Sequence, residues 1–526
     1  MMILRAHLQE SLRAANSSQR AARRRAGRLH ATARALLPAA LLGVTAAAQD
    51  LTFESDPLGE PPAGWRISGV KPESFEARVA SSPDHRRALR IERVGPGGFI
   101  IMSARSRPIA AGTVAIRVRA MVHADRVQSR ISGFFVTLRD ARGQVVATDN
   151  MNGRPVTGSR PWGRVETTLP VYPGATQLEF GPTLAGRGGV LWLDDFRVEA
   201  LTANDIGTPS VEAQSFALRA LETLREHALR SDSIDWDDAR ARLLAGLLGA
   251  QSNSATYDAL RDIARYVDRH TKFYSPEEMA RKRATSPADA EPIELEMPSG
   301  RLLPQGVGYV LVPGVHVLDD ARLQTFADAL STLVFEIEEA GATRWIIDLR
   351  RNGGGSMYPM LAGLEPLLGT GDLGYFVTND DQATPWYIVP VEERSTRPGV
   401  PVEGIGSVRR RLRAPEAPVA VLIGPGTTSS GEVVALSFRG RPDTALVGSP
   451  TGGFTTGNQL HELPGGAVLA ITTSVYADRS LRRYGGPVHP DVTVDQPLRR
   501  GTQPGGDDDP GIQAARDWLN SHSRRR

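Results

Sequence analysis

The chain has 526 residues, of which 40% are hydrophobic and 23% charged, a balance typical of a soluble protein with more than one globular domain. It contains no cysteine, which excludes disulfide bonds, a thiolate nucleophile and cysteine-ligated zinc. The net charge of +3 is distributed unevenly along the chain.

The first 48 residues have the composition of a targeting segment. They hold eight Arg, no Lys and one Glu, with an apolar run over 35–44 and three alanines before Gln49. This pattern predicts a signal peptide over residues 1–48, with a retained membrane anchor as the alternative. Loss of this segment removes a net +7, so the remainder carries −4 instead of +3. We therefore expect a periplasmic or extracellular protein with no stable membrane span after cleavage and no nucleic-acid partner.

Residues 49–203 alternate apolar and polar side chains between turn signals, as in 114–121 and 191–198. The alternation predicts an antiparallel β-sandwich. Trp65, Trp162 and Trp192 are candidates for a sugar-stacking platform, although tryptophan is more often part of the core.

Three stretches resemble those of galactose-binding-like jelly rolls: the opening Phe53-Glu with Gly64-Trp65, Pro161-Trp162 before a strand, and the closing Trp192-Leu-Asp-Asp-Phe-Arg-Val-Glu199. Such domains bind sugars or protein surfaces, so the resemblance implies a carbohydrate or protein ligand. The adjacent acids Asp194 and Asp195 are a weak signal for a calcium site.

Residues 209–284 have apolar residues at helical spacing, and His270 follows them. A histidine after a helix is usually a surface residue that interacts favourably with the helix dipole, and catalytic use is the alternative reading. The expected helices are 210–229, 235–244 and 257–266.

Residues 300–522 alternate strands with helices, which predicts an α/β layered domain with its loops at strand ends. Residues 285–303 are read as a polar, Pro-rich connection, and residues 370–415 as a variable stretch. The expected strands are 306–314, 344–350, 419–423, 444–448 and 467–473, and the expected helices are 319–340, 357–368 and 511–520.

The segment Gly424-Pro-Gly-Thr-Thr-Ser-Ser-Gly-Glu432 lies between an apolar strand and a helix. This arrangement would expose the Ser429 hydroxyl above the sheet, as a nucleophile requires. Glu432 follows Ser429 by three residues, which is also the pattern of a helix capping box.

Acyl transfer needs a hydroxyl, a base and two N–H donors for the oxyanion. Ser429 supplies the hydroxyl, His270 the base, and Ser430 N–H one donor. The turn 353–355 supplies the other donor because glycine permits close backbone approach. The glycines are not followed by Lys-Ser/Thr or by the acid of a dinucleotide site, which argues against a phosphate-binding loop. No cofactor and no metal are expected.

Three ordered motifs resemble those of the tail-specific or C-terminal processing serine peptidases. They are Asp348-Leu-Arg-Arg-Asn-Gly-Gly-Gly355, Thr427-Thr-Ser-Ser-Gly-Glu432 and Pro490-Asp491-Val492. The resemblance implies a crotonase-like ββα core and Ser429 as the nucleophile. It further implies Gly354 and Ser430 as oxyanion donors, with Gly353, Gly355 and Glu432 in support.

Members that use a Ser–Lys dyad have the lysine in a Phe-Gly-Lys-Gly turn. The corresponding turn here is Gly453-Phe-Thr-Thr-Gly457, which has no lysine. The chain therefore resembles the Ser–His branch of the nisin-resistance and tricorn core peptidases, which implies His270 as the base. Tyr484 stands where tricorn-like members have a glutamate, so the orienting acid is unassigned, with Asp268 as a candidate. A PDZ domain has no room between 271 and 306, and the sandwich is expected to recruit substrate instead.

The sequence thus predicts an exported serine endopeptidase with four parts: 1–48, 49–203, 209–284 and 300–522. One alternative is an inactive peptidase fold that binds an apolar ligand or a peptide, as in the interphotoreceptor retinoid-binding protein that the family also resembles. Another alternative is a glycan-binding protein that acts through its sandwich.

Overall fold

The computed structural model describes most of the chain after the predicted signal peptide, which lies outside the described residues. Among the residues described, no helix is long and apolar enough to span a membrane. The described residues are 49–83, 87–104, 106–129, 131–151, 154–186, 188–284, 293–389, 398–402, 411–494, 506 and 508–523.

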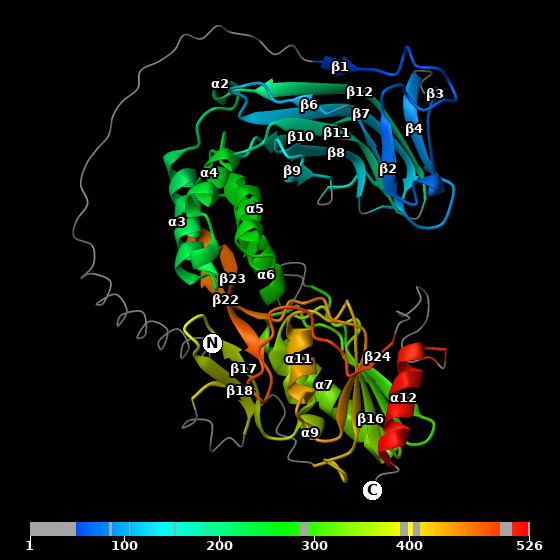
Figure 1. Ribbon diagram of the computed structural model, residues 1–526, viewed down its shortest axis with the longest axis vertical. Coiled ribbons are helices and arrows are strands. Elements are labelled where there is room, and N and C mark those ends of the chain that lie inside the picture. The colour runs from blue at the N-terminus through cyan, green and yellow to red at the C-terminus, as the bar shows by residue number, and fades with distance from the viewer. Residues whose placement is uncertain are drawn as a thin grey trace, which may run out of the picture. The chain divides into compact units, whose positions relative to one another are not determined.

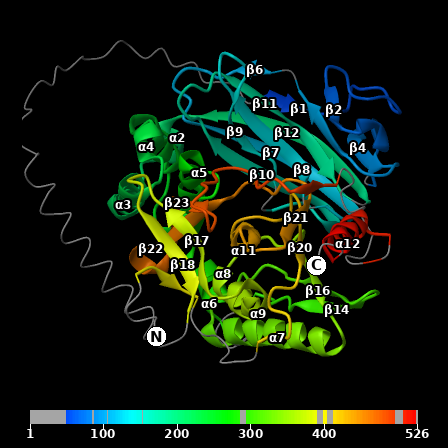
Figure 2. The same cartoon turned by 60° about the horizontal axis from the view of Figure 1, so that its bottom comes forward.

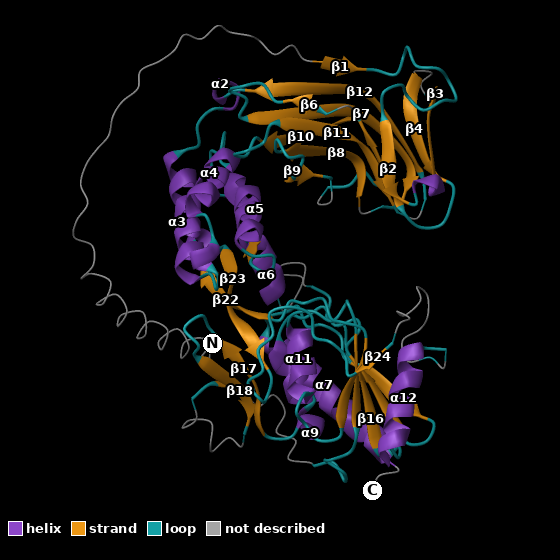
Figure 3. Ribbon diagram, viewed as in Figure 1, coloured by secondary structure: helices purple, strands orange, loops and turns teal. Residues whose placement is uncertain are grey.

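The N-terminal part is a sandwich of two antiparallel sheets, seen as two layers of strands in Figure 3. Alternate side chains of both sheets meet in one hydrophobic core, as the sequence alternation predicts. One sheet contains β10 (Gly158–Pro170), β7 (Ala115–Val127), β12 (Val190–Leu201), β4 (Arg87–Arg93), β3 (Phe75–Ser81) and β1 (Gln49–Leu51). The other contains β2 (Arg66–Val70), β5 (Phe99–Ser103), β11 (Gln177–Ala185), β8 (Ile131–Arg139), β9 (Val145–Asp149) and β6 (Arg107–Pro108).

A helical segment follows the sandwich, and the three predicted helices occur close to their expected positions (Figure 1). Their apolar faces pack against one another and against residues 463–471, so the segment packs on the C-terminal part of the chain. Its helices are α2 (Ala203–Ile206), α3 (Val211–His227), α4 (Trp236–Gly246), α5 (Tyr257–Val267) and α6 (Pro276–Arg283).

The C-terminal part is built on a six-stranded sheet that is parallel except for its first strand. One face is covered by helices α7, α8 and α11, and the other by α12, as Figure 2 shows. The strands, in sheet order, are β14 (Ser299–Leu303), β15 (Val307–Leu311), β16 (Arg344–Asp348), β20 (Val419–Ile423), β21 (Thr444–Gly448) and β24 (Val492–Thr493). The helices are α7 (Asp320–Glu339), α8 (Met357–Gly363), α9 (Glu365–Leu368), α11 (Ser430–Phe438) and α12 (Pro510–Ser523).

A second sheet packs beyond the helices, where its Leu373, Trp386 and Tyr476 join the same hydrophobic core as α7 and α11. The sheet also receives a short strand from the helical segment, β13, which pairs with β23. Its strands are β13 (Lys272–Tyr274), β23 (Val468–Ala477), β17 (Gly371–Val377), β18 (Ala383–Ile388), β19 (Val400–Pro401) and β22 (Thr456–Glu462).

Several sequence-based assignments in this part are wrong. The stretch 285–303, read as a connection, contains strand β14, and the variable stretch 370–415 contains strands β17, β18 and β19. The helix expected over 357–368 is two helices, because Pro366 lies in the first turn of α9 and has no N–H to continue α8. The strands in these stretches pair with near neighbours in the sequence, and they were missed because burial along them does not alternate regularly.

A buried ion cluster ties the last helix to the strand that carries the glycine turn. Arg350, just after β16, donates to both carboxylate oxygens of Asp509, at 2.7 and 2.6 Å. It also donates to Asp348, whose Oδ2 accepts the hydroxyl of Tyr309 at 2.9 Å. The two carboxylates raise the pKa of Arg350, so the guanidinium remains charged although it is mostly buried.

We predict that Asp509→Asn lowers the free energy of unfolding by about 1.5–3 kcal/mol, because the buried Arg350 loses one of its two charged hydrogen-bond partners and keeps only Asp348. Chemical denaturation measures the change. The neighbouring Asp508 is exposed, so Asp508→Asn is the matched control and should stay within about 0.5 kcal/mol of wild type. Equal stability of the two variants would contradict the assigned role of the cluster.

Candidate active site

The candidate nucleophile Ser429 lies at the junction of a buried strand and a helix. Strand β20 ends at Ile423, and Thr427 ties the following loop to the end of β16 by donating to the Leu349 carbonyl at 2.8 Å. Ser429 then adopts φ 54° and ψ −121°, a backbone conformation that residues with side chains rarely take. Such strain costs of the order of 1–3 kcal/mol and concentrates at functional sites.

Glu432 fixes the backbone around this serine. Its carboxylate accepts the N–H of Ser429 at 2.9 Å, as in a capping box, and that of Gly453 at 2.9 Å. It also accepts the hydroxyl of Thr451, and burial raises its pKa. The acid of the predicted cap therefore binds the backbone, while the Ser429 hydroxyl faces another partner.

That partner is His270, which lies 159 positions earlier in the sequence. Its Nε2 is 3.1 Å from Ser429 Oγ. The residue follows the end of α5, and Asn458 donates to its carbonyl at 2.9 Å. Partial burial lowers the pKa of His270 to about 4, so the ring is neutral and able to accept a proton at ordinary pH.

The second ring nitrogen of His270 does not contact Asp268, the candidate orienting acid. Asp268 instead accepts the backbone N–H of His270 at 2.7 Å and the Thr472 hydroxyl at 3.0 Å. The group beside Nδ1 is the Thr456 hydroxyl, at 2.7 Å. Sequence reasoning missed Thr456, although it belongs to the turn in which the lysine of Ser–Lys relatives was sought.

The glycine turn lies directly against the serine. A Cβ on Gly354 would stand 2.8 Å from the Ser429 Cβ, and the φ of Gly354 is 91°, so only glycine fits here. However, the Gly354 N–H already donates to Asn352 Oδ1 at 3.0 Å. As an oxyanion donor, the role expected from the sequence, it would have to share or release this bond. Gly353 shows neither positive φ nor a comparable close approach.

Gly355 has a different environment. It forms a parallel bridge in which Val315 donates to the Gly354 carbonyl at 2.8 Å and accepts the N–H of Ser356 at 2.6 Å. In such a bridge the central residue turns its own N–H and C=O to the opposite side. The Gly355 carbonyl accepts the Ser430 hydroxyl at 2.5 Å, so this residue lies against the start of α11.

Tyr476 of β23 is a buried residue that lies next to Ser429. The phenol is buried and interacts with the Ser429 hydroxyl, and burial raises its pKa. Two other residues of the sequence motifs are structural. Asp491 accepts the Leu446 N–H at 2.8 Å, and the Tyr484 hydroxyl donates to an aspartate 2.8 Å away instead of approaching His270.

The sandwich residues singled out from the sequence do not converge. Trp65 packs among the phenylalanines of the core and cannot stack on a ligand together with the other two tryptophans. Trp192 lies under the guanidinium of Arg90 and is 9% exposed, and Trp162 lies beside His123. These two belong to the sheet face opposite the core.

The acids Asp194 and Asp195 gain no third metal ligand in the described structure, where no group of three His, Asp or Glu side chains could hold a metal ion. Asp194 is buried, and burial raises its pKa, which favours the neutral acid over the carboxylate that calcium requires.

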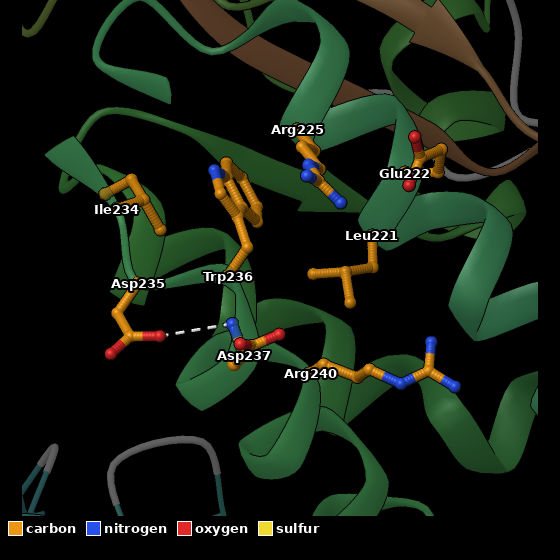
Figure 4. Close-up of a pocket in the computed structure, with 8 residues that line it drawn as sticks. All are labelled: Leu221, Glu222, Arg225, Ile234, Asp235, Trp236, Asp237 and Arg240. Atoms are coloured by element: carbon orange, nitrogen blue, oxygen red, sulfur yellow. Dashed lines mark hydrogen bonds between the residues drawn. The ribbon is translucent and has the colours of Figure 1, made fainter. Parts of the chain in front are cut away.

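A separate pocket of about 290 Å³ lies between α3 and α4, away from the serine. Figure 4 shows the Trp236 ring at its side and the Asp235 carboxylate directed to the backbone N–H of Asp237, 3.1 Å away. None of the predicted site residues lines this pocket. Its lining residues are Leu221, Glu222, Arg225, Ile234, Asp235, Trp236, Asp237 and Arg240.

Residues 306–494 match the sequence model of peptidase family S41. The chain is 28% identical to the nisin-resistance protein of Lactococcus lactis over 53% of this chain and 82% of that protein. It is also 28% identical to a carboxyl-terminal-processing protease of Synechocystis over 41% of this chain and 44% of that protein. Among solved structures, a lipoprotein from Streptococcus agalactiae is 23% identical, with a TM-score of 0.48 over 60% of this chain and 99% of that one.

We predict that Ser429→Gly is more stable than Ser429→Ala by about 1 kcal/mol, because glycine relieves the positive φ that alanine retains. Chemical denaturation of the two variants measures the difference. Ser437, inside α11, is the matched control: there the alanine variant should be the more stable one, by about 1 kcal/mol. The same order of stability at both positions would contradict strain at Ser429.

Proposed function

We propose that this chain, which belongs to peptidase family S41 and is a serine-type peptidase, is an endopeptidase with Ser429 as nucleophile and His270 as general base. A peptide or protein substrate follows from the family. The observation that carries the proposal is the 3.1 Å contact between Ser429 Oγ and His270 Nε2. This distance is within the reach required of a nucleophile and its base.

In the first half of the reaction, His270 Nε2 takes the proton of Ser429 while Oγ attacks the peptide carbonyl. The neutral state of the histidine supports this role, since a protonated ring has no lone pair to accept with. The strained backbone of Ser429 directs its side chain out of the loop, as in other sharp strand-to-helix turns that carry a nucleophile.

We infer that the oxyanion is bound by Ser430 N–H together with an N–H of the glycine turn. Ser430 is the first residue of α11, where backbone N–H groups have no acceptor within the helix. On the turn, Gly355 N–H is the better candidate because Gly354 N–H is held by Asn352. Each such donor is typically worth about 2.7–4 kcal/mol of the barrier.

In the second half, the protonated His270 gives its proton to the leaving amine, which breaks the peptide bond and leaves an acyl group on Ser429. A water molecule then donates a proton to His270 and attacks the ester. The acid is released, and the serine and histidine return to their starting states.

The roles of the other parts of the chain are also proposals. We infer that residues 1–48 direct export. We also infer that the S41 part has the layers of a crotonase-like fold. The functional parts of the protein would then be residues 49–203, 209–284 and 300–522. The sandwich is inferred to recruit substrate, with a protein surface or a glycan as its ligand, because the polar outer face around Trp162 is not used by the sandwich core.

We predict that Ser429→Ala and His270→Ala each lower kcat/KM on a peptide library by about 10³-fold or more, because each removes a member of the dyad. The exposed His489 supplies the control, and His489→Ala should cleave like wild type. Undiminished cleavage by either dyad variant would refute the assignment. If wild type neither cleaves peptides nor reacts with a fluorophosphonate at Ser429, the peptidase fold serves as a binding protein.

We predict an acid limb of kcat/KM near pH 4, well below the ordinary histidine value of 6.5, because burial disfavours protonated His270. The free energy of unfolding should also fall as pH drops from 6.5 towards 4, since the unfolded chain binds a proton that the folded chain does not. A pH–rate profile over the acid range tests this, and a limb near 6.5 would contradict it.

A further inference from the structure

We propose that Thr456 is the positioning residue of this site and that a neutral hydroxyl takes the place of the orienting acid. The inference rests on the proposed function of Ser429 and His270. Its basis is the 2.7 Å contact between Thr456 Oγ1 and His270 Nδ1, on the side of the ring opposite the serine.

The proton positions follow from the two contacts. To accept the serine proton, Nε2 must be unprotonated, so the single proton of the neutral ring lies on Nδ1. Nδ1–H then donates to Thr456 Oγ1, which accepts with a hydroxyl lone pair. In the other tautomer, Nε2–H would face Ser429 and could not act as a base. The hydrogen bond to Thr456 therefore favours the productive tautomer and fixes the plane of the ring.

Thr456 is well suited to hold a ring in one orientation. It is the first residue of β22, its backbone is paired with Val475 of β23, and it is only 9% exposed. Its branched Cβ restricts rotation about χ1. From the same strand, Asn458 binds the His270 carbonyl at 2.9 Å, so β22 holds both the ring and the main chain of the histidine.

No carboxylate in the described structure hydrogen-bonds to the ring. Asp268 accepts the backbone N–H of His270, and Glu432, on the serine side, accepts backbone N–H groups. Burial is the main cause of the lowered pKa of His270; the charge of Asp268 favours protonation of the ring, and the charges of Lys272 and Arg269 disfavour it. Tyr476 of β23 faces the serine and is neutral.

Thr456→Val, Thr456→Ser and Thr456→Asp test the proposal, with kcat, KM and the pH profile measured for each. Thr456→Val should lower kcat by about 10- to 100-fold with little change in KM, because the bond to the developing imidazolium is lost. Thr456→Ser, which keeps the hydroxyl, should stay within about threefold of wild type. Thr456→Asp should move the acid limb upward by about one pH unit or more, since a nearby carboxylate favours protonated histidine.

The adjacent Thr455 supplies a matched control. It is fully buried and donates to the Gly486 carbonyl at 2.8 Å, away from the histidine. Thr455→Val loses a buried hydrogen bond but should leave the pH profile unchanged. This separates loss of packing from loss of histidine orientation.

The outcomes also separate this inference from the proposed function. If His270→Ala is inactive while Thr456→Val retains wild-type kcat, the positioning role is refuted and the dyad stands. If the Thr456 and Thr455 valine variants lose activity equally, with unchanged pH profiles for both and for Thr456→Asp, Thr456 is only structural. If His270→Ala cleaves like wild type, the proposed function fails first.

Discussion

The site depends on the backbone of Ser429, which is held at φ 54° between a buried strand and a helix. That conformation is unfavourable by itself, so surrounding contacts must impose it. Glu432 holds the serine N–H and the neighbouring Gly453 N–H, and Thr427 ties the loop to β16. Gly354 has no side chain where a Cβ would meet that of Ser429. The strain is therefore balanced by hydrogen bonds and close packing within one small region.

The second constraint is that the proposed base, His270, comes from a different part of the chain than Ser429. His270 follows a helix whose apolar face packs against residues 463–471, and β13, just after it, pairs with β23. These contacts fix the histidine relative to the second sheet, and that sheet shares a core with α11, which begins next to Ser429. The 3.1 Å distance between Ser429 Oγ and His270 Nε2 therefore depends on how the helical segment, the second sheet and α11 pack together.

The periodicity of apolar residues was sufficient to predict the β-sandwich, the helices of 209–284, the strand before Ser429 and the helix after it. The same patterns, with the family resemblance, singled out Ser429 and His270. They did not predict β17, β18 or β22, because burial along these strands does not alternate regularly, although β17 pairs with β18 and β22 with the neighbouring β23. The sequence patterns also did not identify which polar side chain contacts the His270 ring. Asp268 is adjacent to His270 in sequence but binds its backbone, whereas Thr456 approaches from a strand whose position no local pattern specified.

A neutral group beside Nδ1 is consistent with the way charge is used elsewhere in the site. The carboxylates of Glu432 and Asp268 accept backbone N–H and hydroxyl donors, and neither forms a hydrogen bond with the imidazole. Burial then dominates the pKa of His270 and keeps the ring neutral. A histidine with a lowered pKa is a weak base, but its ring is unprotonated at ordinary pH and can accept a proton. Catalysis at this site would therefore rely on accurate ring orientation and on the oxyanion donors more than on the basicity of the histidine.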